Sequence, residues 1–530
     1  MLLPAGRASS STSREPPAAD AGEDITQETT PVSENTPRRS LTWGLNARSM
    51  APERVGTEIT QRYDLLDDEL GSGGSGNTVR VGRDKLLKGR LVAVKKVVRT
   101  DTANHTTEII KREVQIMKDL DHPSICKLFE TYAKGRHMFF VMEHLEGGDV
   151  GNRLVEQGPL PEPMAAAIAR QVSGALLYAH SKGIAHRDMK PENICFCSTS
   201  PDEFRVKVID WGLGKHFIEG RLCSSVGTIS YTAPEVLMAV NQDQAAGYTS
   251  SCDLWSLGVT AYTMLSCKAP FWGQLEKQLR KMQDERYPLS GSIWDGISDE
   301  GKSFVSQLLK FAPEERISAA ELLGHPWTVG HAMPRDTSCL AEVLRNVERF
   351  SHASDILFFC TASLARQLDH RSLTKIYRAF SWLDADGDGR LALPEFANGF
   401  REVFGADSGE FRDVENVFDR LDFERTGSLS YTTFCAAGIS EDYHTDDDML
   451  LAAFKTFDVL DNGRISPEDM QEVSSAPVWK DLANHVMEKM GRQEGGVSFE
   501  EWAMLVRESA SRHAALLAHR GAAEGPVADP

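Results

Sequence analysis

The chain has 530 residues, 41% hydrophobic and 25% charged, a composition typical of a soluble protein with about three to four domains. Its formal net charge of −19 argues against a general nucleic-acid binder, because nothing offsets repulsion by phosphates, and suits a protein that collects cations. The nine scattered cysteines include no CxxC pair, and no apolar run approaches the ~18 residues of a membrane span. We therefore expect an intracellular, cytoplasmic protein without a transmembrane segment.

Residues 1–60 are rich in Ser, Thr, Pro, Ala and Glu and have few large apolar side chains. Such a segment cannot bury enough apolar surface to offset the entropy of ordering, so it is predicted to be a disordered extension. From Tyr63 the pattern becomes dense and globular as far as Trp327, which defines a first domain at residues 63–327.

A glycine-rich motif opens this domain, with GxGxxG at Gly71, Gly73 and Gly76 in a β-rich context. The strand LVAVK follows and ends at Lys95. This order fits a hairpin over the phosphates of ATP, with a lysine on the next strand for the α- and β-phosphates. Glu113, on a predicted helix, is placed to pair with Lys95.

A second block, HRDMKPEN, supplies the groups that phosphoryl transfer requires. Asp188 can accept the proton of a hydroxyl, Lys190 can contact the γ-phosphate, and Asn193 can hold magnesium. Asp210, in the segment VIDWG, can be the second magnesium ligand. The segment that follows closes with Ala233-Pro234-Glu235.

These motifs, in this order, resemble those of Ser/Thr protein kinases over residues 63–327. The resemblance implies a two-lobed α+β fold, with a β-rich N-lobe and a helical C-lobe, that uses ATP and Mg²⁺. Besides the glycines and Lys95, the cofactor-binding residues that it implies are Leu70, Val79, Met142, Glu143, Leu145 and Asp149. It also implies a Glu235–Arg316 ion pair, a catalytic loop braced by Asp253, and recognition of basic substrates by Asp149 and Glu192.

Two residues depart from the kinase pattern. Trp211 replaces the usual Phe after the magnesium-binding Asp, and Thr78 stands where a Val usually covers the adenine. Neither change removes a charged catalytic group, so we expect the domain to be active.

Residues 338–370 are predicted to form junction helices. In LAEVLRNVERF, apolar residues recur at helical spacing on one face, with Arg345 and Arg349 on the rest. The apolar face consists of Leu340, Val343, Leu344, Val347 and Phe350.

Residues 371–506 carry four copies of an EF-hand loop pattern and are predicted to be an all-α domain. The first copy, DADGDGRLALPE at 384–395, satisfies the pattern in full. Its predicted Ca²⁺ ligands are Asp384, Asp386, Asp388, the carbonyl of Arg390, and Glu395. All four copies keep an aliphatic residue where EF-hands pair through a short β-contact; these are Leu391, Leu429, Ile465 and Val497.

The other three loops are degenerate. Loop two (422–433) ends in Thr433, and loop four (490–501) has Arg492 at a ligand position, so both are predicted to be structural partners with little metal affinity. Loop three (458–469) has Leu460 where its second oxygen ligand should be. Its remaining candidate ligands are Asp458, Asn462, the carbonyl of Arg464, and Asp469. Two interpretations of loop three stay open, a weak calcium site and a structural loop.

A kinase domain followed by a junction and four EF-hand repeats resembles the calcium-dependent protein kinases of plants and protists, over nearly all of residues 63–506. The resemblance implies a junction that restrains the kinase at rest and an EF-hand domain that withdraws it when calcium binds. We expect a monomer that phosphorylates proteins with basic residues before the acceptor. Phosphorylation of Ser224 or Ser225 is a further hypothesis, in which the new charge orders the segment through Arg187.

Two alternatives stay open at this point. The EF-hand domain could be a docking scaffold on a kinase that is active without calcium, which the three degenerate loops favour. A non-catalytic calcium-binding adaptor would require Lys95, Asp188, Asn193 and Asp210 all to be idle. Residues 508–530, rich in Ala and Gly, are predicted to be a flexible tail.

Overall fold

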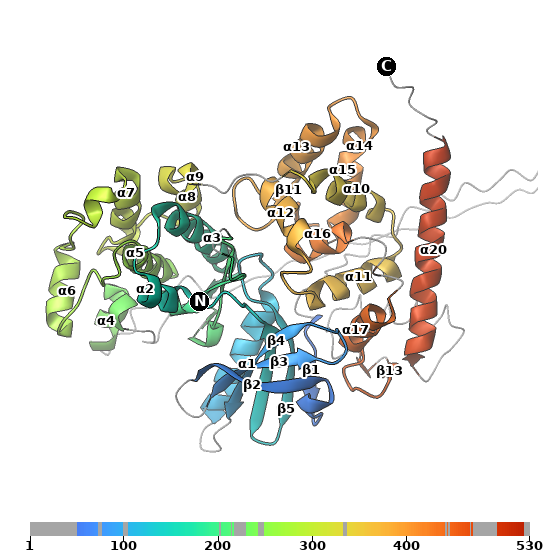
Figure 1. The fold of residues 1–530 in the computed structure, drawn as a ribbon, viewed down its shortest axis with the longest axis horizontal. Coiled ribbons are helices and arrows are strands. Elements are labelled where there is room, and N and C mark those ends of the chain that lie inside the picture. The colour runs from blue at the N-terminus through green and yellow to red at the C-terminus, as the bar shows by residue number, and fades with distance from the viewer. Residues whose placement is uncertain are drawn as a thin grey trace, which may run out of the picture. The chain divides into compact units, whose positions relative to one another are not determined.

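The computed structural model shows a two-lobed α+β domain followed by a helical module, as predicted (Figure 1). The residues that it describes are 50–72, 77–98, 104–200, 203–213, 215–216, 229–241, 249–331, 337–423, 425–439, 443, 446–466, 468–469 and 496–523. They all fall within one compact unit. In this part of the chain, the helices are too short or too polar to cross a lipid bilayer.

The N-lobe is a six-stranded sheet in the order β1-β5-β6-β4-β3-β2. Its strands are β1 (Glu53–Val55), β2 (Tyr63–Ser72), β3 (Thr78–Asp84), β4 (Leu91–Val98), β5 (Leu128–Lys134) and β6 (His137–Glu143). Neighbouring strands are antiparallel except for β1 and β5, which are parallel. Helix α1 (Asn104–Asp119) buries Val114 and Met117 in the same apolar cluster as Phe140 of β6, which fixes the helix beside the sheet.

The C-lobe is built around two helices that are largely buried, α3 (Glu162–Ser181) and α5 (Ser251–Ser266). Its other helices are α2 (Val150–Gln157), α4 (Pro234–Asn241), α6 (Leu275–Gln283), α7 (Asp299–Leu308), α8 (Ala319–Leu323) and α9 (Pro326–Gly330), and its short strands are β7 (Ile184–Ala185), β8 (Ile194–Phe196), β9 (Val206–Val208) and β10 (Lys215–His216). Nearly every residue of α5 is buried. A Cβ at Gly258 would lie only 2.7 Å from Cβ of Leu308, so glycine is required for α5 to approach α7 this closely.

The EF-hand module, α10 to α20, has a core of its own. Its helices are α10 (Leu340–Phe350), α11 (Asp355–Gln367), α12 (Thr374–Leu383), α13 (Leu393–Phe404), α14 (Gly409–Arg412), α15 (Val414–Leu421), α16 (Tyr431–Gly438), α17 (Asp447–Phe457) and α20 (Phe499–Ala523). The helical pattern predicted for the junction is confirmed by α10, whose five predicted apolar residues are all buried. Both α10 and α11 pack on α16, and α11 also packs on α17, so the junction helices share the core of the EF-hand loops.

The predicted β-contacts between EF-hand loops are confirmed. Strand β11 (Leu391–Ala392) pairs with β12 (Ser428–Leu429), with Leu391 opposite Leu429. Strand β13 (Arg464–Ile465) pairs with β14 (Val497–Ser498), with Ile465 opposite Val497. The loops therefore act in pairs, one with two and three with four.

The predictions for the two ends of the chain are wrong in part. Residues 50–60 were assigned to the disordered extension, yet Met50 is buried and β1 pairs with β5. Their order comes from partners far along the chain, which composition does not reveal. Residues 508–523 were assigned to the flexible tail, yet α20 continues to Ala523, because this stretch is rich in alanine, the residue with the highest helix propensity. Residues 1–49 and 524–530 lie outside the described part.

Replacing Leu344 by Ala should destabilise the EF-hand module by about 3 kcal/mol, because it leaves a cavity where a fully buried side chain packs. The measurement is the denaturant dependence of hydrogen exchange in α10 and α16 of the full chain. The matched control is Arg349→Ala on the exposed face of the same helix. An equal loss of stability in both variants would contradict the role given to this apolar face.

Candidate active site and calcium loop

Lys95, Glu113 and Asp210 meet in one ion-pair cluster. Lys95 lies in β4 and Glu113 in α1, and Nζ of Lys95 is 2.6 Å from Oε1 of Glu113 and 3.0 Å from Oδ1 of Asp210. Burial alone would lower the pKa of Lys95, but the two carboxylates outweigh it and hold this pKa above its usual range. Burial would raise the pKa of Asp210, and the ammonium of Lys95 holds it below its usual range instead. The cluster therefore keeps a fixed positive charge beside an ionised carboxylate.

Asp188, Lys190 and Asn193 converge in the loop after β7. Nζ of Lys190 lies 2.7 Å from Oδ2 of Asp188. The side-chain amide of Asn193 donates to the backbone carbonyl of Asp188 at 2.7 Å and to its carboxylate at 3.2 Å. The N–H of Ile209, the residue before Asp210, donates to the carbonyl of Asn193 at 2.9 Å. The two residues predicted to hold magnesium are thus brought to adjoining backbone segments, and both offer the oxygen ligands that Mg²⁺ prefers.

The backbone of this loop is held by Asp253, a fully buried residue of α5. Its carboxylate accepts hydrogen bonds from the N–H groups of His186 at 2.9 Å and of Arg187 at 2.7 Å. Arg187 has φ of 73°, in the left-handed region that costs energy for a residue with a side chain. The two bonds from Asp253 stabilise this conformation, so the predicted brace is confirmed.

Trp211 packs beneath the site, as expected for a larger ring in place of Phe. It is fully buried and meets the ring of His186 edge to face, with 4.6 Å between ring centroids. A Cβ at the next residue, Gly212, would lie 3.2 Å from Oδ1 of Asp210 and 3.3 Å from the carboxylate of Glu113. The turn therefore accommodates the tryptophan, and its backbone at Gly212 runs close to both carboxylates.

The β2–β3 hairpin and β6 carry the residues predicted to bind the nucleotide. Gly71 lies opposite Val79 in the ladder, and Leu70 beside it is 49% exposed. Met142 and Leu145 are half-buried at the end of β6 and just beyond it. Gly73 and Gly76 lie outside the described residues.

The carboxylate of Glu143, a residue predicted to bind the nucleotide, is buried and already paired within the protein. Its Oε2 lies 3.0 Å from Nζ of Lys207 in β9, and its Oε1 accepts the backbone N–H of His370 at 2.7 Å. Burial would raise the pKa of Glu143, but Lys207 and His370 hold it well below its usual range. The backbone carbonyl is what Glu143 can offer to a nucleotide. No motif in the sequence marks Lys207 or His370 as its partners.

The two residues predicted to recognise basic substrates are neighbours. The carboxylate of Asp149 accepts the N–H of Asn152 at 2.8 Å and so caps α2. A Cβ at Gly151 would lie 2.9 Å from Cγ of Glu192 and 3.1 Å from Oδ1 of Asp149. Two carboxylates therefore flank the start of α2, an arrangement that suits a guanidinium.

The predicted Glu235–Arg316 pair is confirmed as a bidentate contact, with both nitrogen–oxygen distances at 2.7 Å. It ties the start of α4 to the C-lobe core, because Arg316 is buried and also donates to the carbonyl of Ser251. Ser224 and Ser225 lie outside the described residues.

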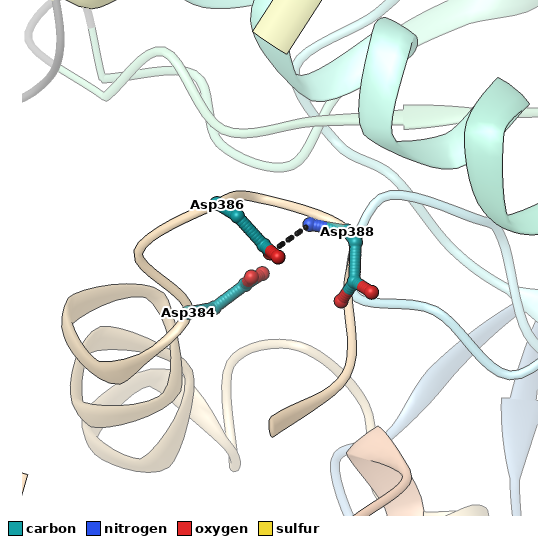
Figure 2. Close-up of side chains that lie close together, drawn as sticks. All are labelled: Asp384, Asp386 and Asp388. Carbon is teal, nitrogen blue, oxygen red and sulfur yellow. Dashed lines mark hydrogen bonds between the residues drawn. The ribbon is translucent and has the colours of Figure 1, made fainter. Parts of the chain in front are cut away.

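Figure 2 shows Asp384, Asp386 and Asp388 of loop one converging from the turn that follows α12. They are the one group of three or more acidic, histidine or cysteine residues in the described ranges whose ligand atoms all lie within 4.8 Å of one another. Glu395, at the start of α13, accepts the N–H of Ala385 at 2.9 Å and so faces the same loop. Burial and the neighbouring carboxylates raise the pKa of Asp384 well above its usual range. A set of crowded oxygen ligands of this kind fits Ca²⁺, whose charge would relieve the repulsion.

Loop three differs because its carboxylates are satisfied by other groups of the protein. Nζ of Lys455 lies 2.9 Å from Oδ2 of Asp458 and 2.5 Å from Oδ1 of Asp461. Asp469 accepts the hydroxyl of Ser466 at 2.6 Å. Asn462 accepts the N–H of Arg464 at 2.9 Å, a bond that loop one also has, between Asp388 and the N–H of Arg390, so the charge from Lys455 is what sets loop three apart.

Loop two keeps the loop turn, although it has few ligands. Asp422 accepts the N–H of Gly427 at 2.8 Å, as Asp384 accepts that of Gly389 in loop one. In loop four, Glu501 accepts the N–H of Ser498 at 2.9 Å. Glu424 of loop two and residues 490–495 of loop four lie outside the described part.

Comparison with known proteins places this geometry in a family. A model of the protein kinase domain matches residues 65–328. Calcium-dependent protein kinase 3 of Plasmodium yoelii yoelii is 31% identical over 417 residues, which cover 78% of this chain and 74% of that protein. Calcium-dependent protein kinase 5 of Plasmodium falciparum (isolate 3D7) is 28% identical over 462 residues, 84% of this chain and 78% of that protein. The chain is thus a protein kinase and belongs to the calcium-dependent protein kinase family.

Proposed function

We propose that this chain transfers the γ-phosphate of ATP to Ser or Thr of basic protein substrates and that calcium, bound in loop one, controls the transfer. The observation that carries the catalytic part is the ion-pair cluster, in which one ammonium, on Lys95, contacts both Glu113 and Asp210. An active kinase requires two arrangements at once, the pairing of Lys95 with Glu113 and a metal-binding Asp210 held in place.

We assign the roles around this cluster from chemistry and position. Bound ATP with Mg²⁺ supplies the phosphoryl group and shields its charge. Asn193 and Asp210 hold the metal, and Lys95 orients the nucleotide phosphates. Asp188 orients the substrate hydroxyl and accepts its proton, while Lys190, 2.7 Å from Asp188, balances charge near the γ-phosphate.

Calcium control is supported by where loop one lies. Its Ala385 carbonyl accepts a hydrogen bond from Arg170 of α3 at 3.1 Å. A Cβ at Gly174 of α3 would overlap the carbonyl oxygen of Gly387, so this loop rests directly on the C-lobe. Since α10 and α11 pack on α16, the helix after loop two, we propose that calcium at loop one repositions the junction together with loops one and two and so relieves its restraint on the kinase.

Replacing Asp188 by Asn should lower phosphate transfer about 10²- to 10⁴-fold, because the amide cannot accept the substrate proton. The assay is transfer of labelled γ-phosphate to a Ser peptide in saturating calcium, with ATP binding measured separately as the control for folding. For the wild type, chelating calcium should slow the same transfer about 5- to 150-fold. Undiminished transfer by Asp188→Asn would exclude the proposed chemistry. Wild-type activity that is equal in calcium and in chelator would indicate that the EF-hand module is a docking scaffold.

Replacing Asp149 by Asn together with Glu192 by Gln should raise KM about tenfold for a peptide with Arg three residues before Ser, because two charges that hold the guanidinium are lost. Asn is as good a helix cap as Asp, so α2 should keep its start. A peptide with Ala in place of Arg is the control and should be phosphorylated equally by both proteins. A change in kcat alone, identical for the two peptides, would argue against substrate recognition by this pair.

A further inference from the structure

The segment Met50–Val55, called the arm below, touches both the N-lobe and the EF-hand module. Strand β1 of the arm pairs with β5 in the N-lobe sheet. Met50, at its start, is fully buried in the apolar core of the EF-hand module. The arm therefore has one neighbour on each side, although the composition of residues 1–60 as a whole predicted disorder.

Arg54 makes the polar part of this bridge. Its side chain is 2% exposed, and its Nε lies 2.7 Å from the carboxylate of Glu130 in β5. The rest of the guanidinium donates to two backbone carbonyls at loop three, those of Asp458 at 3.0 Å and Lys455 at 2.7 Å. One side chain thus binds the N-lobe through a charge and the EF-hand module through hydrogen bonds.

The chemistry of both partners suits a guanidinium. The two carbonyls lie at the C-terminal end of α17, where backbone oxygens lack partners within the helix and the helix dipole favours a cation. Glu130 is fully buried, and it also accepts the hydroxyl of Tyr63 at 2.6 Å. Nη1 of Arg62 also lies 2.9 Å from this carboxylate, so two guanidinium groups compensate Glu130, and loss of Arg54 would leave its buried charge less well paired.

Lys455 gives loop three the positive charge that a functional EF-hand loop takes from calcium. It contacts Asp458, the first ligand position, and Asp461, three residues later. The corresponding positions of loop one hold Ser381 before the loop and Gly387 within it, neither of which carries charge. Loop three therefore has a lysine at this position and loop one does not. The lysine lies beside the carbonyls that Arg54 binds.

We propose that loop three is a calcium-independent docking site for Arg54 of the arm, and that the arm fastens the EF-hand module to the N-lobe sheet. Lys455 neutralises Asp458, so the loop keeps its shape without a metal, and the end of α17 stays open to the guanidinium. Calcium then enters the chain at loop one and leaves this contact unchanged.

The first test is hydrogen exchange of the full chain with Arg54 replaced by Gln. Loss of the charged hydrogen bonds should raise exchange in α17 at least about tenfold, in calcium and in chelator alike. The control is Arg83→Gln, an exposed arginine of the same sheet. Unchanged exchange in α17, or an increase confined to β1 and β5, would overturn the proposal. A rise that extends to α5 of the C-lobe would signal general unfolding, and the second measurement then decides.

The second test counts calcium by equilibrium dialysis of the full chain. The wild type should bind calcium, and Glu395→Gln should abolish this binding. Adding Asp458→Asn to Glu395→Gln should therefore cause no further loss of bound calcium. Calcium retained by Glu395→Gln and removed by Asp458→Asn would show that loop three binds the metal and would overturn the proposal. Neither measurement uses phosphate transfer, so their failure is distinguishable from failure of the proposed kinase function.

Discussion

A buried carboxylate must be paired, and the pairing of Glu143 determines how three parts of this chain meet. Its partners are Lys207, on the strand that leads to Asp210, and His370, which follows the second junction helix. Nearby, the ammonium of Lys127 donates to the carbonyls at the end of α11. Leaving any of these charges alone in the interior would cost several kcal/mol, of the order found for broken buried pairs. The end of the N-lobe sheet, the strand before the metal-binding aspartate and the end of the junction therefore share one charge network.

The need to pair carboxylates with a positive charge also distinguishes loop one from loop three. In loop one the carboxylates crowd together, and their repulsion favours a divalent cation. In loop three an ammonium from Lys455 has already neutralised the first carboxylate. Calcium adds little electrostatic stabilisation to a loop whose carboxylates are already paired with a lysine. It adds much more to a loop whose carboxylates repel one another. The number of acidic residues in a loop is thus a poorer guide to metal binding than the charge that surrounds them.

Much of the active site could be predicted because its chemistry dictates residue types in a fixed order. Lys95, Asp188 and Asp210 are examples, and the aliphatic positions of the paired loops followed from a simple backbone contact. The side chain of Glu143 could not be predicted, since its partner His370 lies 227 residues away and carries no motif. The arm was missed for the same reason, because Arg54 finds its carbonyl partners more than 400 residues further on. The extension of α20 to Ala523 agrees with the high alanine content of this stretch, a signal that a position near the end of the chain does not cancel.

We propose that calcium in loop one controls phosphate transfer. The most direct measurement is the rate of transfer to an Arg-containing Ser peptide as free calcium is stepped from chelated to saturating, for the wild type, Glu395→Gln and Asp469→Asn. These variants change the last ligand position of loops one and three. We expect the wild type and Asp469→Asn to become active when calcium is added, while Glu395→Gln stays at the rate measured in chelator. Equal calcium activation of Glu395→Gln and the wild type would contradict it, as would full activity of all three proteins in chelator.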